Sequence, residues 1–279
     1  DYEKLPGLTA IITDKNETRW AGSYGFSDGV NPMNIESTFS ICSISKLFTS
    51  VALMQLVEDG KLNLDDRIQD VLPWFDIQND FINSPDLTVK SIMSHSSGLP
   101  RESNHPYWSW PDFPFPTKES VVDELKNQKM LYPPSKYYQY SNLGLSLLGF
   151  IVEEVSGLSF DDYVNKNILQ PLNLSNTKTY MSIEDYGNIL SLGYSSLNRN
   201  VERDKVNFFN ADGIAAAAGF TSNVLDLAKF ARWQLNLLSS SEKNILLPET
   251  LKDMHKVHWD DDLSSVTRGL GFGVYNLDG

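Results

Sequence analysis

The stretch Ser43-Ile44-Ser45-Lys46 opens the most regular hydrophobic pattern of the 279-residue chain. Apolar residues then recur at helical spacing as far as Gly60, a residue type that commonly follows the last turn of a helix. Ser43 and Lys46 are three residues apart, so we expect their side chains to share one helix face, with Ser43 in the first turn. The sequence therefore predicts a hydroxyl and an amine held together on a half-buried helix.

This pairing of Ser43 with Lys46 suits nucleophilic catalysis. A serine alcohol needs a base beside it, and a lysine can be that base when burial or a neighbouring cation lowers its pKa. Backbone N–H groups at a helix N-terminus, including that of Ser43, favour the negative charge that develops during acyl transfer. Ser-x-x-Lys also occurs by chance in helices, with serine as a cap and lysine in solvent, so the motif needs a second group of residues.

Tyr140-Ser141-Asn142 provides that second group. It follows the turn signal at 133–135 and directly precedes the apolar helical run 143–155. A tyrosine phenol, with a reference pKa of about 10, becomes a usable base beside a lysine ammonium. Asn142 can hold the lysine amine or a substrate carbonyl. An aromatic and polar loop packed on the core is the alternative interpretation.

Ser43-Ile44-Ser45-Lys46 and Tyr140-Ser141-Asn142 resemble the first and second motifs of the serine β-lactamases and penicillin-binding proteins. Tyr-x-Asn is similar to the branch of class C β-lactamases, D,D-carboxypeptidases, D-aminopeptidases and related esterases. Further similar strings lie at 54–66, 94–100 and 226–230, in the family's order. The resemblance therefore covers nearly the whole chain.

The resemblance implies a serine hydrolase that needs no metal or organic cofactor. Ser43 carries over as the nucleophile, Lys46 as its proton partner, Tyr140 as general base and later acid to the leaving group, and Asn142 as a polar positioner. The substrate is an ester, a D-amino-acid peptide or a β-lactam. Whether Lys46 or Tyr140 takes the first proton stays open, because the pair titrates as a coupled unit. The competing interpretation is a non-catalytic penicillin-binding or scaffold protein that retains the fold.

The distribution of strand and helix signals predicts an α+β fold. Residues 8–13 and 18–24 read as a β-hairpin and 270–275 as a closing strand, while helical signals cover 88–93, 117–129, 143–155, 160–168 and 223–237. We expect one antiparallel sheet, flanked by helices and built from both chain ends. With the resemblance, this is a β-lactamase-like fold with residues 1–62 plus about 200–279 in the sheet part and about 63–199 in an inserted helical part.

The chain departs from the family in two places. The third motif, a strand with Lys or His, a small residue and Gly, is expected some tens of residues after 270–275, which is beyond Gly279. We therefore expect C-terminal strands to be missing from this sequence, and with them a second oxyanion N–H donor. Ala218-Gly219 stands where two glycines are common, and we expect the added methyl group to narrow the backbone approach.

Composition argues against other classes of function. With 23 basic and 36 acidic residues, the net charge of −13 repels nucleic acid and anionic membranes. The single cysteine, Cys42, excludes an intrachain disulfide, and we interpret it as a small buried hydrophobe. No apolar run reaches the roughly 18 residues of a membrane span, and the sequence opens without a leader. Since many bacterial relatives are exported, the resemblance implies a periplasmic or secreted location.

Three other features have alternative interpretations as functional sites. We interpret His95 as part of a packed turn, hydrogen-bonded to nearby hydroxyls, and not as the base of a Ser-His triad. For His255 and His258, beside the acidic run 260–262, a solvated surface turn is favoured over a metal site. The aromatic, proline-rich segment 105–116 either walls a pocket for an apolar acyl group or packs in a core or interface. Gly-x-Ser-x-Gly, the motif of α/β-hydrolases, is absent.

Overall fold

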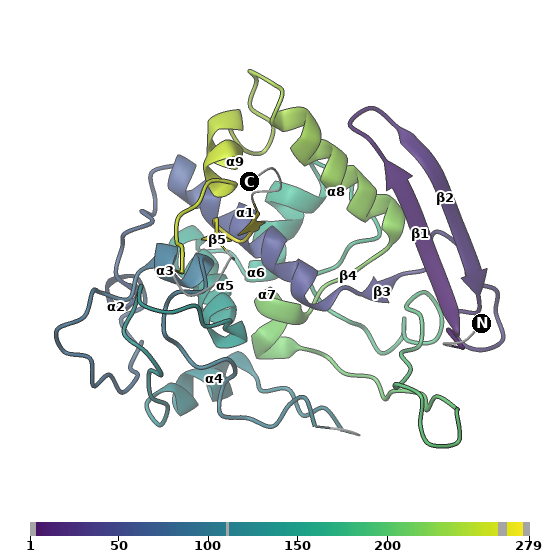
Figure 1. Ribbon diagram of the computed structural model, residues 1–279, viewed down its shortest axis with the longest axis horizontal. Helices are drawn as coiled ribbons and strands as arrows, with labels where there is room; N and C mark the ends of the chain where they lie inside the picture. Colours follow the sequence, from purple (N-terminus) through teal and green to yellow (C-terminus); the bar gives the residue numbers. More distant parts are fainter. Residues whose placement is uncertain (1–3, 110–111, 262–266, 276–279) are drawn as a thin grey trace.

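The computed structural model of the protein describes residues 4–109, 112–261 and 267–275. Strands β1 (Gly7–Thr13) and β2 (Thr18–Gly25) pair in antiparallel fashion along one side of the molecule (Figure 1). The Asp14 carboxylate closes the turn between them by accepting the backbone N–H groups of Asn16 and Glu17. The predicted hairpin is confirmed.

The other described strands are only two residues long. They are β3 (Phe39–Ser40), which pairs with β4 (Thr221–Ser222), and β5 (Thr267–Arg268), which pairs with β6 (Gly273–Val274). The expected single sheet is thus three two-stranded sheets within the described residues. The strands are short because β3 and β4 lead directly into helical segments. The predicted strand 270–275 bends at Gly271, whose φ of +83° breaks the extended backbone.

Helices make up most of the regular structure in the described residues. Their bounds are α1 (Ser45–Glu58), α2 (Ile68–Val71), α3 (Val89–Met93), α4 (Lys118–Leu125), α5 (Asn142–Ser156), α6 (Phe160–Val164), α7 (Ala215–Ala218), α8 (Val224–Leu237) and α9 (Pro248–Met254). The predicted helices near 88–93, 143–155 and 223–237 are confirmed within one residue at each end. Together with the small antiparallel sheets, they give the α+β class that the sequence predicts.

Helix α1 runs through the centre of the molecule (Figure 1). We expected a half-buried helix, but α1 is enclosed on nearly every side, with Phe48 and Val51 fully buried on it and Thr49 and Ser50 buried as well. A helix that is apolar around most of its circumference belongs inside a core. Gly60 follows the helix with φ +67°, as the sequence predicts.

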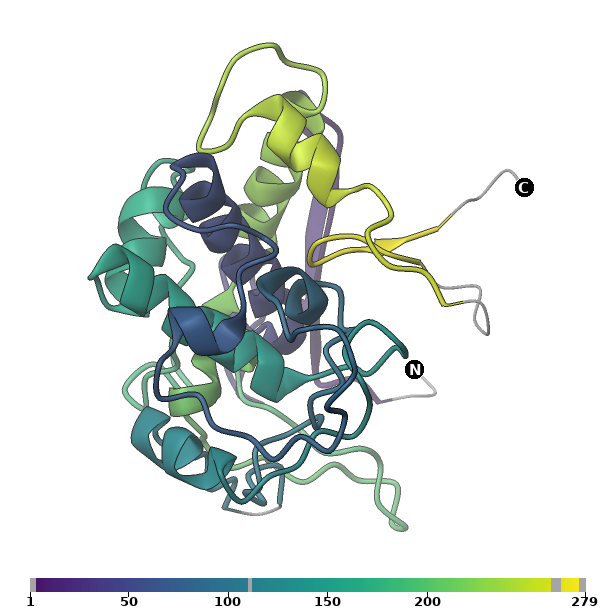
Figure 2. The same ribbon diagram turned by 90° about the vertical axis from the view of Figure 1, so that its left-hand side faces the viewer.

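Helix α5 packs against both α1 and α7 (Figure 2). It begins at a capped residue, since the Ser141 hydroxyl accepts the Gly144 N–H at 2.8 Å, and it ends at Gly157, whose φ is +71°. Within it, Gly149 lies against α7, and a Cβ atom there would come within 2.4 Å of the Ala216 Cβ. The two helices therefore approach as closely as a glycine allows.

Apart from α5, the described helices between residues 63 and 199 are short and alternate with irregular segments. Helix α4 ends at Leu125, four residues before its predicted end, because the chain turns there and Met130 then pairs with the backbone of Gln78. The predicted helix 160–168 divides into α6 and a π-helical turn, η2 (Asn165–Leu169). The proposed division into sheet and helical parts at about 62 and 200 stays a prediction.

Helix α8 joins the hairpin to the core. Its Arg232 guanidinium donates to the hydroxyls of Thr13 and Thr18 at 3.0 and 2.9 Å, on β1 and β2. On its inner face Phe230 stacks on Phe48 of α1, with ring centroids 4.4 Å apart. The hairpin and the central helix are thereby fixed relative to each other.

The longest apolar helices bear on whether the chain could cross a membrane. In the part of the chain that the structure describes, no single helix is both long and apolar enough to cross a bilayer. The segments Asn142–Ser156 and Phe160–Leu169 meet the criteria only as a pair, and they are bent by 79° relative to each other.

Candidate active site

Ser43 lies in a single 3-10 turn, η1 (Cys42–Ile44), immediately before α1. We expected it in the first turn of the α-helix, which begins two residues later at Ser45. The Ser45 hydroxyl fixes this turn, because it donates to the Cys42 carbonyl at 2.5 Å and accepts the Phe220 N–H at 3.1 Å. Ser43 itself is exposed. The turn therefore presents the Ser43 side chain to solvent from a rigid base.

Cys42 is only half-buried, so its interpretation as a buried hydrophobe is wrong. Its Sγ atom lies 3.3 Å from the hydroxyl of Ser40, and its backbone has φ +42°. The tight turn that positions Ser43 prevents Cys42 from reaching into the core.

Lys46 is buried, with 5% of its surface exposed, and points at Ser43. Its Nζ atom lies 3.3 Å from Ser43 Oγ and donates to Asn142 Oδ1 at 2.7 Å and to the Ala217 carbonyl at 2.8 Å. Burial lowers the Lys46 pKa to about 7, although the negative charge of Glu102 acts in the opposite direction. A large share of the molecules therefore carries a neutral amine at neutral pH.

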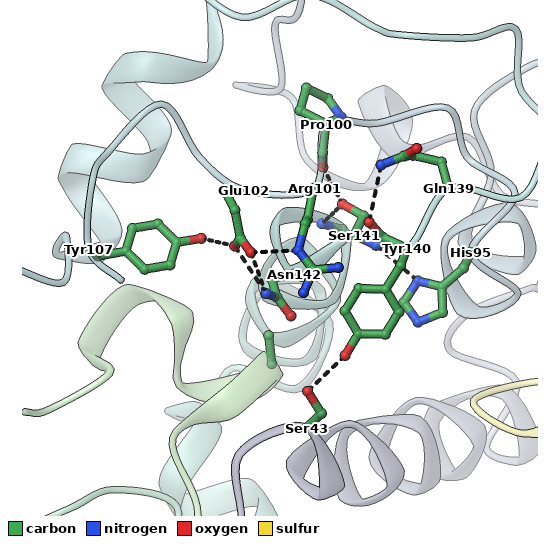
Figure 3. Close-up of polar contacts among 12 residues, drawn as sticks. Ser43, His95, Pro100, Arg101, Glu102, Tyr107, Gln139, Tyr140, Ser141 and Asn142 are labelled. Carbon is green, nitrogen blue, oxygen red and sulfur yellow. Dashed lines mark hydrogen bonds and ion pairs between the residues drawn. The ribbon is translucent and has the colours of Figure 1, made fainter. Parts of the chain in front are cut away.

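Tyr140 is the second side chain that contacts Ser43, and it lies next to Lys46. Its hydroxyl donates to Ser43 Oγ at 2.8 Å (Figure 3). Its ring is held by His95, which stacks on it at 4.4 Å, and by Lys46 and Arg101, whose charged groups lie 4.8 and 4.9 Å from its centroid. Burial raises the Tyr140 pKa above its usual value, so the phenol keeps its proton at neutral pH.

Asn142, the first residue of α5, connects Lys46 with the loop that carries Arg101 and Glu102. Its backbone N–H donates to the Arg101 carbonyl at 2.7 Å, which fixes the start of the helix. Its Oδ1 accepts from Lys46, and its Nδ2 donates to both carboxylate oxygens of Glu102, at 2.8 and 3.0 Å. The structure thus brings together all four residues predicted from the motifs, Ser43, Lys46, Tyr140 and Asn142. Their catalytic roles stay predictions.

Three neighbours of these residues escaped the sequence analysis. Glu102 holds Asn142 and also accepts a hydrogen bond from the Tyr107 hydroxyl. Arg101 forms an ion pair with Glu102, with Nε 3.2 Å from Oε1, and Ala217 contributes a backbone carbonyl to Lys46. The signal for Arg101 and Glu102 was their place directly after the string 94–100. Nothing in the sequence distinguishes the carbonyl of Ala217.

His95 occupies a packed turn, as expected, but with a different partner. Its backbone has φ +55°, and its Nδ1 accepts the Ser141 N–H at 3.2 Å instead of bonding to neighbouring hydroxyls. Burial, reinforced by the charge of Lys46, lowers its pKa to about 3. His95 is therefore neutral and supports the Tyr140 ring.

In the part of the segment 105–116 that the structure describes, aromatic side chains pack on one another beside Glu102. Tyr107 is fully buried, and its ring lies 4.9 Å from that of Phe115, which stacks in turn on Phe209 at 5.2 Å. Trp108 remains 42% exposed, and Trp110 lies outside the described residues. Of the two alternatives, core packing accounts for Tyr107 and Phe115.

His255 and His258 are both half-buried, so they are less solvated than the expected surface turn. His258 Nε2 hydrogen-bonds to the Asp253 carbonyl at 2.9 Å, and burial lowers the pKa of His255. Asp262 lies outside the described residues, and no cluster of three or more His, Cys, Asp or Glu within them can hold a metal ion. Ala218 ends α7 and is buried, while a Cβ at Gly219 would come within 2.6 Å of the Ala215 backbone. The family's glycine is thus sterically required at 219.

The whole chain, residues 1–279, matches the protein family described as beta-lactamase, and it belongs to that family. It is 30% identical over 188 residues to beta-lactamase-like protein 2 of Dictyostelium discoideum, an alignment covering 65% of this chain and 34% of that protein. It is 28% identical to a putative D-alanyl-D-alanine carboxypeptidase of Escherichia coli, over 96% of this chain and 68% of the relative.

A solved structure supports the same assignment. The octameric penicillin-binding protein homologue from Pyrococcus abyssi superposes with a TM-score of 0.81 at 26% identity, over 98% of this chain and 62% of that one. The β-lactamase-like fold and the family predicted from the motifs are therefore confirmed. The chain spans only about a third of the Dictyostelium protein and about two thirds of the other two.

Proposed function

We propose that the protein is a serine hydrolase that transfers an acyl group to Ser43 and then hydrolyses the acyl-enzyme. One observation carries the proposal: Ser43 Oγ lies within hydrogen-bonding distance of both the Tyr140 hydroxyl and the Lys46 amine, at 2.8 and 3.3 Å. An exposed serine between a neutral phenol and a buried amine is suited to attack on a carbonyl carbon. Relatives named as hydrolases, such as the putative D-alanyl-D-alanine carboxypeptidase of E. coli, support the general class.

The arrangement around Lys46 favours it as the first base. A neutral lysine amine has two N–H groups and one lone pair. The two N–H groups are directed at Asn142 Oδ1 and the Ala217 carbonyl, which leaves the lone pair for the proton of Ser43. Its pKa of about 7 suits a general base at neutral pH.

The proton balance of the reaction follows from these contacts. Ser43 Oγ bonds to the acyl carbon while its proton passes to Lys46, and the Ser43 N–H supports the oxyanion. As the bond to the leaving group breaks, Tyr140 protonates that group and regains a proton from the Lys46 ammonium. Water then attacks the acyl-enzyme ester by the same path, which releases the acid and restores Ser43.

The proposed substrate class follows from the kinds of acyl donor that can acylate Ser43. We propose an ester, a D-amino-acid peptide or amide, or a β-lactam as the acyl donor, since all three present a carbonyl and a leaving group that accepts a proton. A panel of short acyl nitrophenyl esters, D-amino-acid nitroanilides and a chromogenic cephalosporin ranks them. A periplasmic or secreted location, proposed from the family resemblance alone, is tested by fractionating the source cells.

The decisive experiment is covalent labelling of the full-length protein. A fluorophosphonate probe and a penicillin are incubated with it, and the modified peptide is found by mass spectrometry. We expect an adduct on Ser43 and none in the Ser43→Ala variant. Folded protein that forms no adduct with either probe would support the alternative of a non-catalytic protein that retains the fold.

A further inference from the structure

Glu102 contacts the nitrogen of the Asn142 amide (Figure 3), while the oxygen of the same amide accepts from Lys46. Its carboxylate accepts both contacts from Asn142 Nδ2, a hydrogen bond from the Tyr107 hydroxyl, and an ion pair from Arg101. Its side chain is 23% exposed, so solvent screens these contacts only in part. The reaction proposed above assigns no task to this group.

The carboxylate determines which way the Asn142 amide faces. An asparagine amide can turn by half a revolution, which exchanges its oxygen and nitrogen. A carboxylate only accepts, so Nδ2 must face Glu102 and Oδ1 must face Lys46. In the reversed orientation an oxygen would face the Glu102 carboxylate and an N–H donor would face the lysine N–H groups. Glu102 therefore gives Lys46 one of its two acceptors.

The orientation matters because it controls the direction of the Lys46 lone pair. With acceptors at Asn142 Oδ1 and the Ala217 carbonyl, the third direction of the amine points to Ser43. Without the Asn142 acceptor, one N–H would compete for the Ser43 hydroxyl. Glu102 thus acts on the nucleophile through two intermediaries, Asn142 and Lys46.

The charge of Glu102 also reaches Lys46. After burial, it is the largest influence on the Lys46 pKa, which it raises; Arg101 lowers that pKa and Cys42 raises it by smaller effects. The other titratable groups beside the lysine, Tyr140 and His95, are neutral at pH 7, since burial raises the pKa of the first and lowers that of the second. Glu102 is therefore the main electrostatic support of the Lys46 ammonium.

We propose that Glu102 is the positioning residue of this site, orienting the Asn142 amide toward Lys46 and holding a negative charge near its amine. The proposal rests on the proposed function of Ser43 and Lys46. Glu102 thus has two proposed effects, the orientation of the Asn142 amide and the negative charge near Lys46. Conservative variants can distinguish them. Glu102→Gln keeps an oxygen for Asn142 Nδ2 but removes the charge, while Glu102→Asp keeps the charge but withdraws it by one methylene group.

The test measures the rate of fluorophosphonate labelling of Ser43, in the full-length protein, from about pH 5 to about pH 10. In Glu102→Gln we expect the limb of the pH profile that reports Lys46 to move about one unit lower, because the charge that favours the ammonium is gone. In Glu102→Asp we expect this limb within a few tenths of a unit of wild type and a labelling rate about 10-fold lower.

Glu153→Gln is the matched control. Glu153 is similarly exposed, at 26%, and is paired with Lys118, but it belongs to the outer part of α5 and serves as a cap for the Phe160 N–H. Its variant should label Ser43 with the wild-type rate and pH profile. Melting temperatures of all variants report whether each is folded.

The outcomes separate the two proposals. If wild type is not labelled at Ser43, the proposed function fails. If wild type and Glu153→Gln are labelled and Glu102→Gln has an unshifted pH profile, the role of Glu102 is overturned, whatever its rate. If Glu102→Gln does not fold, Glu102→Asp decides, and a labelling rate equal to wild type overturns the positioning role.

Discussion

Lys46 and Lys178 are both hydrogen-bonded lysines, yet their surroundings have opposite effects on their charge. Lys46 is buried and bonds to an amide and a carbonyl oxygen, and its pKa falls to about 7. The Lys178 side chain is 42% exposed and donates to the Asp185 carboxylate at 2.6 Å, which raises its pKa. Neutral acceptors hold an amine in position without stabilising its charged form. A carboxylate holds the amine in position and also stabilises the ammonium.

Exchanging each lysine for methionine tests this contrast most directly. Lys46→Met removes the proposed base, and we expect labelling of Ser43 by a fluorophosphonate to slow by about 1,000-fold or more. Lys178→Met should label at the wild-type rate. The measurement is the second-order labelling constant of each folded variant, and comparable rates for both variants would remove Lys46 from the mechanism.

Asn142→Asp gives Lys46 a partner like that of Lys178. The new carboxylate would also face Glu102, which now accepts from Asn142 Nδ2, so part of its charge is offset by a proton shared with Glu102. The negative charge in contact with the amine still favours the ammonium, so the Lys46 pKa rises and the proposed base is protonated at pH 7. We expect labelling of Ser43 at pH 7 to fall by about 10- to 100-fold. The profile should recover at alkaline pH, and a uniform loss at every pH would indicate a disturbed structure instead.

The two lysines should also differ in their effect on stability. Because the Lys46 pKa falls from 10.5 to about 7 on folding, its burial opposes folding fully below pH 7. Between these values the unfolded state binds the additional proton, so wild-type stability rises with pH. Lys46→Met should therefore be more stable than wild type by about 1–4 kcal/mol at pH 6, and by less at pH 10. Denaturant unfolding at both pH values measures this difference.

The smallest effect is expected for the stability of Lys178→Met. The Lys178 pKa is raised on folding, so its ion pair stabilises the protein below pH 10.5 and stops doing so as the pH rises through the folded value. Since the pair is partly exposed, we expect a loss of at most about 1 kcal/mol at pH 7. Added salt screens the ion pair, so the loss of stability should be smaller when denaturant unfolding is measured at high salt.

Sequence patterns predicted the long elements and failed on the short ones. Helices α1 and α5 each combine a sustained apolar period with a terminal signal, Gly60 in one and Ser141 in the other, so their bounds could be read. Strands of two residues, such as β3 and β4, have no period to detect. Within the described residues the predicted antiparallel sheet is divided into three small ones, and the predicted α+β class is confirmed.

At the candidate site, the sequence predicted the residues that belong to a motif. It did not predict the residues that hold them in place. Ser43, Lys46, Tyr140 and Asn142 stand at characteristic spacings near helix starts. Glu102 lies in a loop just after the string 94–100, and that position alone assigns no role to one acidic residue among 36. Ala217 acts through its carbonyl, which every residue type possesses.

The contact of Gly149 with Ala216 limits how this protein can be engineered. Replacing a glycine inside a helix by alanine is a common route to thermostability and gains up to about 1 kcal/mol. Here the new methyl group would meet Ala216 at 2.4 Å and push α7 away from α5. The next residue of α7 is Ala217, whose carbonyl holds Lys46. A substitution that is favourable by helix propensity alone would therefore displace a residue of the candidate active site.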